Sequence, residues 1–76
     1  MNREKLITMA NQIGAFFAAN PQREQAVADI AAHLARTWDP RMRREILACL
    51  AQTDGAGLAP LVREAVGRLT QDSASA

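Results

Sequence analysis

The chain has 76 residues, of which 49% are hydrophobic and 22% are charged, and its formal net charge is +1 at pH 7. This balance offers no strong field for nucleic acid or an anionic membrane, and the single Cys excludes an internal disulfide. No apolar run approaches the roughly 20 residues of a membrane span, and none follows the first residues as in a secretory signal. We therefore expect a small cytoplasmic domain, marginally stable without a partner, in which the unpaired thiol stays reduced.

The first helix is expected over about residues 3–19, because apolar residues recur there at spacings of three and four. Ala10 and Gly14 lie four residues apart beside Asn11, so they form a groove of small side chains on one helix face. Such a groove admits either another helix of the same chain or a separate protein. The apolar residues that recur at these spacings are Leu6, Met9, Ala10, Ile13, Phe16 and Phe17.

Two prolines set the expected boundaries of the second helix. Asn20 precedes Pro21 as an N-cap precedes the first helical position, and the residue before Pro40 is pushed out of helical geometry. The second helix is therefore expected from Pro21 to about Trp38, with one buried stripe. The stripe consists of Val27, Ile30, Ala31, Leu34 and Trp38.

The stretch Trp38–Arg44, which we name the corner, contains the clearest helix start in the sequence. Asp39 is expected to cap a third helix, with Pro40 at its first position, where the missing N–H costs nothing. Three arginines then fall in the first turn, near the positive end of the helix dipole, where local electrostatics disfavours them. They are Arg41, Arg43 and Arg44.

The rest of the chain predicts two further helices, over about residues 40–52 and 59–69, on either side of a glycine-rich loop at 54–57. β-branched residues never alternate with polar ones, so no strand is expected. The expected fold is all-α: a small bundle of about four short helices with a helix-turn-helix corner at Trp38–Pro40. It is expected to form one domain over residues 1–70, followed by a disordered C-terminal tail over 71–76.

The residue inventory does not favour an independent enzyme. His33 lies four residues after Asp29, a spacing that could orient the imidazole for base catalysis or metal ligation. The only candidate nucleophile is Cys49, which follows Ile46 at core spacing and has no glycine-rich oxyanion element beside it. The glycines follow a helix rather than a strand, so no phosphate-binding loop is indicated. We expect no catalytic residue and no metal ligand, and we expect His33 to be structural or to face a partner.

Met9, Phe16 and Phe17 could line a cofactor pocket. Their spacing is more typical of a helix face packed in a core, and a chain this short has little room for a sizeable cavity as well. We therefore expect these residues in the core and expect no cofactor bound by this chain.

Three interpretations of the arginines in the corner compete. They could be solvated, with their stems lying over Trp38. They could form a protein-binding surface, since Trp and Arg dominate interface hot spots. They could also belong to the recognition helix of a DNA-binding helix-turn-helix protein. The near-neutral net charge counts against the last, because phosphate contacts supply most non-specific affinity for DNA.

Three segments of the chain carry a combined pattern. They are Met9-Ala10-Asn11-Gln12-Ile13-Gly14 followed by Phe16-Phe17; Ile30-Ala31-Ala32-His33-Leu34 leading to Trp38-Asp39-Pro40-Arg41-Met42-Arg43; and Gly57-Leu58-Ala59-Pro60-Leu61-Val62-Arg63. Together, over about residues 5–69, they resemble the delta subunit family of soluble NAD-dependent formate dehydrogenases. The sequence from Trp38 to Met42, occurring after the first segment, is a more specific signal than any single short motif. One departure is Cys49, where a His is expected in relatives, so no shared role is carried over to that thiol.

The resemblance implies a non-catalytic accessory subunit that assembles or stabilises a cytoplasmic enzyme. In that enzyme the alpha subunit carries a molybdenum or tungsten pterin and oxidises formate to carbon dioxide. Iron–sulfur clusters and FMN in the beta and gamma subunits pass the electrons to NAD. The alternatives are a helix-turn-helix nucleic-acid-binding protein and a transient maturation chaperone. The residues expected to bind the larger subunits are Trp38, Asp39, Pro40, Arg41, Met42, Arg43, Arg44, His33, Ala10, Asn11 and Gly14.

Overall fold

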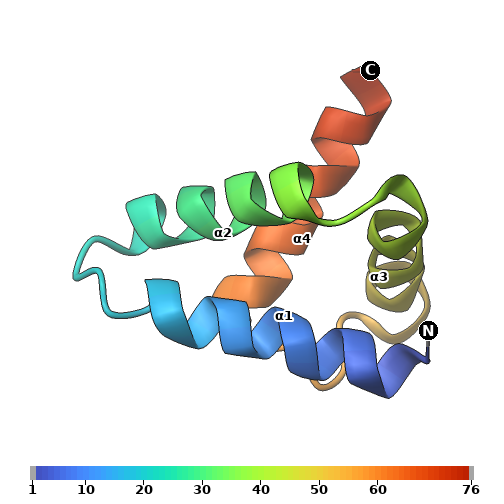
Figure 1. The fold of residues 1–76 in the computed structure, drawn as a ribbon, viewed down its shortest axis with the longest axis horizontal. Helices are drawn as coiled ribbons and strands as arrows, with labels where there is room; N and C mark the ends of the chain where they lie inside the picture. Colours follow the sequence, from blue (N-terminus) through green and yellow to red (C-terminus); the bar gives the residue numbers. More distant parts are fainter. Residues whose placement is uncertain (1, 76) are drawn as a thin grey trace.

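The computed structural model describes residues 2–75, with side chains described through Leu69. Within that range the secondary structure consists of four α-helices, without a strand. The helices are α1 (Arg3–Phe17), α2 (Arg23–Thr37), α3 (Pro40–Thr53) and α4 (Pro60–Ser75) (Figure 1). The prediction of an all-α fold of about four short helices is confirmed. None of the described helices is long and apolar enough to span a bilayer.

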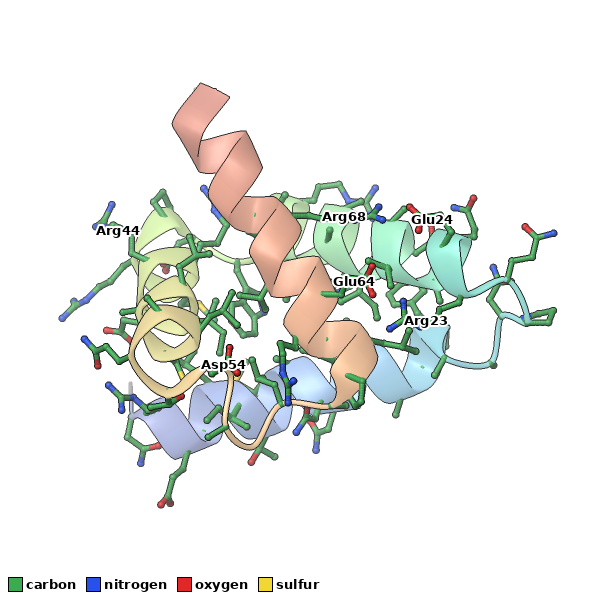
Figure 2. The ribbon with its side chains drawn as sticks, turned by 180° about the vertical axis from the view of Figure 1, so that it is seen from behind. Arg23, Glu24, Arg44, Asp54, Glu64 and Arg68 are labelled. Atoms are coloured by element: carbon green, nitrogen blue, oxygen red, sulfur yellow. The ribbon has the colours of Figure 1, made fainter. Side chains whose placement is uncertain are left out.

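The helices α1 and α2 lie side by side, and α3 stands across one end of this pair (Figure 1). The helix α4 crosses one face of the α1–α2 pair, and from behind it lies in front of the other helices (Figure 2). Among the described elements, no helix covers the opposite face of the pair. This asymmetry leaves one side of α1 and α2 open to contact.

All four helices contribute to one hydrophobic core. Its buried members are Leu6, Ala10, Val27, Ile30, Ala31, Leu34, Trp38, Ile46, Leu58, Val62, Ala65, Val66 and Leu69. The stripe predicted for the second helix is entirely buried, so the three- and four-residue spacing identified its inner face. Cys49 is also buried, as expected of a thiol that packs as a small hydrophobe.

The first two helices are shorter than the sequence indicated. α1 ends at Phe17, and α2 begins at Arg23 with Gln22 as its N-cap, so the prediction of Asn20 as the cap and Pro21 as the first helical residue is wrong. The reason is local: the Asn20 side chain accepts a hydrogen bond from the Gln22 backbone N–H at 2.9 Å. This Asx turn keeps Pro21 in the connection and delays the helix by two residues.

The start of α3 is as predicted. Asp39 is its N-cap, its Oδ1 accepts the Met42 backbone N–H at 2.8 Å, and Pro40 occupies the first turn. The helix ends at a left-handed Asp54 with φ 56°. Both glycines of the following loop also take positive φ, as their freedom from a Cβ allows.

The helix α4 runs from Pro60 through Ser75, past the end that its apolar stripe indicated. The predicted boundary between domain and tail therefore does not coincide with the end of a helix. The disorder predicted for residues 71–76 stays a prediction.

Candidate protein-binding surfaces

The indole of Trp38 is buried, with 5% of the residue exposed, and it belongs to the core cluster. The sequence analysis placed this ring both in the buried stripe of the second helix and among the residues expected to bind a partner. The structure agrees with the first placement, because the ring packs inward at the α2–α3 connection. Trp38 therefore anchors the corner to the core, and the exposed side chains of the corner belong to the residues that follow it.

Arg43 closes the corner by hydrogen bonding. Its guanidinium Nη1 donates to the carbonyl oxygen of Ala35 at 3.0 Å and to that of Trp38. The Ala35 carbonyl belongs to the last turn of α2, where carbonyl groups lack helical partners, and Trp38 is the residue that follows the helix as its C-cap. An arginine that was disfavoured at the start of its own helix thus caps the end of the preceding one.

The other two arginines of the corner point outward. The Arg41 side chain is 81% exposed, and its Nε lies 3.8 Å from the Glu45 carboxylate, one turn along α3. Arg44 is exposed at the outer edge of α3 (Figure 2). Asp39 and Pro40 are exposed beside them, whereas Met42 is half-buried against the core. The exposure of Arg41 and Arg44 agrees with two of the three interpretations, solvated side chains and a protein-binding surface.

The small-residue groove of α1 is filled by the chain itself. Ala10 and Gly14 are both buried, and an ideal Cβ built on Gly14 would come well within 3.0 Å of Val62 Cγ2 on α4. The groove therefore serves the close approach of α1 and α4. The expectation that it lies open to a separate protein is corrected.

Asn11 fastens the loop before α4. Its Nδ2 donates to the carbonyl oxygen of Gly57, and its Oδ1 accepts the backbone N–H of Ala59, both at 2.9 Å. One amide side chain thus satisfies a carbonyl and an N–H at the start of α4. This gives Asn11 a structural role inside the chain that spacing alone did not indicate.

The structure shows an apolar groove whose lining includes Met9, Phe16 and Phe17, the residues that the sequence analysis considered for a pocket and then assigned to the core. The expectation that the chain has little room for a sizeable cavity is wrong. The groove lies between α1 and α2, has a volume of about 450 Å³, and we name it the α1–α2 groove. It is lined by Met9, Gln12, Ile13, Phe16, Phe17 and His33.

Phe16 is 75% exposed, so its predicted place in the core is wrong. Phe16 and Phe17 are consecutive and lie about 100° apart on the helix, so both cannot face the core. That adjacency was the available signal.

His33 lies at the edge of this groove rather than in a catalytic pair. Its ring meets the Phe17 ring edge-on, with centroids 5.8 Å apart. The expected partner, Asp29, instead accepts a hydrogen bond from Gln25 Nε2 at 2.8 Å. In the described part of the chain, no cluster of three or more His, Cys, Asp or Glu side chains is close enough to hold a metal ion.

Two ion pairs fasten α2 to α4 on the opposite face. Arg23 pairs with Glu64, and Glu24 pairs with Arg68, so the charges alternate across the helix contact (Figure 2). These side chains are largely solvent-accessible, and such pairs contribute modestly to stability. This face is thereby occupied by contacts within the chain.

The fold and its surfaces define a small all-α domain with an apolar groove on one face and exposed arginines at one corner. A family model described as the NADH-dependent formate dehydrogenase delta subunit FdsD matches residues 5–66. The chain therefore belongs to the formate dehydrogenase delta subunit family. No curated protein and no solved structure matches it. Membership makes the chain a subunit of an NAD-dependent oxidoreductase and implies association with other formate dehydrogenase subunits.

Proposed function

We propose that this chain is a non-catalytic accessory subunit that assembles or stabilises a cytoplasmic formate dehydrogenase. The observation that carries the proposal is the family match over residues 5–66, which spans most of the four-helix core. The larger alpha, beta and gamma subunits would hold the molybdenum or tungsten pterin, the iron–sulfur clusters and the FMN. In this account the delta chain contributes binding surface and no electron-transfer centre.

A stabilising role has a simple physical basis. A protein that binds the assembled state more tightly than the dissociated subunits shifts the equilibrium toward assembly by mass action. The exposed Phe16 supplies apolar surface for such binding, and the exposed arginines of the corner supply charge. An interface that combines an apolar centre with a polar rim is typical of subunit contacts.

Preparing the enzyme with and without this chain tests the proposal. We expect the chain to be retained in stoichiometric amount, and we expect its omission to shorten the half-life of formate-dependent NAD reduction or to release a larger subunit. Native mass spectrometry reports the subunit composition, and timed assays report the half-life. The proposal would be contradicted if the two preparations had equal half-lives and the same set of larger subunits. Loss of the chain from the mature enzyme would favour a transient chaperone.

The corner is proposed to contribute through its exposed arginines. Arg44→Glu reverses a charge on the outer edge of α3, so we expect it to weaken association with the larger subunits and to make the remaining affinity less sensitive to salt. Arg63→Glu makes the same charge change at an exposed position of α4 and serves as the matched control. Surface plasmon resonance at two salt concentrations measures both. Identical affinities for the two variants would place the corner outside the interface.

A further inference from the structure

The α1–α2 groove has the composition of the centre of an interface. Its lining contains two aromatic rings, a methionine and an isoleucine, and it contains no charged side chain. Aromatic residues and Met are enriched at the cores of protein interfaces, where charged residues are depleted. Phe16 is the one large hydrophobic side chain that stands exposed among residues 2–69. Phe16 is not isolated, because it continues the apolar lining of Met9, Ile13 and Phe17, and contiguous exposed apolar surface is typical of interaction sites.

The geometry of the groove fits a helix. Its lining residues come from α1 and α2, and α4 contributes none of them. The helix α4 crosses one face of the α1–α2 pair (Figure 1). Met9, Ile13 and Phe16 follow one another at spacings of four and three along α1, which is the ridge against which a partner helix packs its own side chains. A helix laid in such a groove uses apolar anchors at positions i, i+3 or i+4, and i+7.

The charged side chains around the groove indicate the sign of the charge that a partner segment would carry. Lys5 lies one turn before Met9 on α1, and Arg36 lies three residues after His33 on α2, so each is a surface neighbour of a lining residue. Both are exposed, and within residues 2–69 neither forms an ion pair. Asp29, four residues before His33, is the third charged neighbour of a lining residue, and it keeps its negative charge while it accepts a hydrogen bond from Gln25. Two cations and one carboxylate therefore surround the groove, so its rim carries a net positive charge.

A basic rim favours a different protein over a second copy of this chain. A two-fold dimer would place the same patch, with its net positive charge, on both sides of the interface. A helix from a larger subunit that carries carboxylates beside its apolar face would meet Lys5 and Arg36 with opposite charge. Family membership supplies such larger subunits.

We infer that the α1–α2 groove is the docking site for an amphipathic, acidic-flanked helix of a larger formate dehydrogenase subunit, which covers Phe16 and pairs with Arg36. The inference rests on the proposed function and identifies the surface and the chemistry of its partner. His33 and Gln12 stand in the lining as the polar groups that fix the position of the docked helix.

Competitive incorporation of the full chain tests this assignment. Wild-type and variant chains carrying different tags are produced together with the larger subunits, and the ratio of tags in the purified enzyme is measured. Phe16→Ala is expected to be incorporated about tenfold less than wild type, because truncating an aromatic hot spot costs at least that much affinity. Phe16→Leu, which keeps the apolar contact, is expected to recover most of the loss. Arg36→Glu is expected to be incorporated less than wild type.

The matched control is Leu61→Ala, which shortens a half-buried apolar side chain on α4, outside the α1–α2 groove. We expect it to be incorporated like wild type. Because Phe16 is mostly exposed, its truncation removes little from the core, and far-UV circular dichroism of each full chain checks that helix content is retained. Normal incorporation of Phe16→Ala, or equal loss for Leu61→Ala, overturns the assignment of the groove.

Replacing Phe16 by photoreactive p-benzoylphenylalanine identifies the occupant directly. Irradiation of the enzyme followed by peptide mass spectrometry is expected to find a crosslink to a helix of a larger subunit with acidic residues beside its apolar face. A crosslink to a second copy of this chain, or to a basic segment, overturns the inference. If groove variants are incorporated normally into an active enzyme, only the groove fails; if the wild-type chain does not copurify with that enzyme, the proposed function fails as well.

Discussion

At the scale of single residues, the close approach of α1 to α4 depends on Gly14. The space that a side chain would need at this position is occupied by Val62. A glycine inside a helix costs about 1 kcal/mol in propensity relative to Ala, and here the packing it permits repays that cost. Gly67, in α4, has nothing within 4 Å of an ideal Cβ and therefore carries the same cost without that packing.

We predict opposite effects of Ala at these two glycines. Gly14→Ala is expected to lower the free energy of unfolding by about 1–2 kcal/mol, the cost of overpacking less the gain in helix propensity. Gly67→Ala is expected to raise it by about 0.5–1 kcal/mol. Urea unfolding followed by the fluorescence of the buried Trp38 measures both. The double variant Gly14→Ala/Val62→Ala should lose less unfolding free energy than the sum of the losses in the two single variants. Strict additivity would argue against a clash between the new Cβ at residue 14 and the Val62 side chain.

Asn11 carries a second prediction at this scale. Asn11→Ala removes two hydrogen bonds to the loop before α4 and is expected to cost about 1–2 kcal/mol of stability. Asn11→Asp keeps the acceptor for the Ala59 N–H and loses the donor to Gly57, so an intermediate cost is expected. Amide hydrogen exchange at Ala59 should accelerate in Asn11→Ala and much less in Asn11→Asp. An unchanged exchange rate at Ala59 in both variants would show that Asn11 does not hold this loop in place.

At the scale of elements, one short stretch ends α2 and begins α3. Asp39 caps the start of α3 through the Met42 N–H, and Arg43 caps the end of α2 through two carbonyl groups. The arginine's placement near the positive end of its own helix dipole is explained by these contacts with the negative end of the preceding helix. The corner is therefore a structural joint with exposed arginines beside it.

We predict that two neighbouring arginines of α3 differ in their effect on stability. Arg43→Ala is expected to cost about 1 kcal/mol, because it leaves carbonyl groups at the end of α2 without a charged donor. Arg44→Ala, at an exposed position, is expected to stay within about 0.5 kcal/mol of wild type. Thermal unfolding followed by circular dichroism compares them. Equal melting temperatures would contradict the capping role of Arg43.

The helix ends show how far local sequence determines structure. Asp39 and Pro40 predicted the start of α3 correctly, because the cap and the proline both act within one turn. Asn20 and Pro21 have the same order, yet α2 starts later, since the Asn20 side chain bonds the Gln22 N–H and stabilises a turn instead. A short motif therefore predicts that a helix begins nearby, and the side-chain hydrogen bond decides at which residue.

The surfaces were less predictable than the helices. Trp38 suits both a core and an interface by residue type; its spacing along the second helix predicted burial, and the packing of the four helices confirms it. Phe16 suited the apolar stripe of α1, but the stripe does not show which side of a helix its neighbours leave uncovered. Spacing identifies an apolar face, and the tertiary arrangement decides whether the chain or a partner covers it.

At the scale of the whole molecule, contacts within the chain account for the α4 side, and the α1–α2 side remains open. Ion pairs and the Gly14 contact with Val62 hold α4 in place. On the other side Phe16 faces water. This asymmetry supports the proposal that another subunit covers the open face.

The central claim is that this chain is a retained subunit of a formate dehydrogenase. Affinity purification through a tag on the chain, from the cells in which it is made, tests this most directly. We expect to recover brown material that contains the larger subunits in stoichiometric amount, absorbs light as iron–sulfur clusters and flavin do, and reduces NAD with formate. Recovery of a colourless 8.2 kDa protein alone would show that the chain is not a retained subunit.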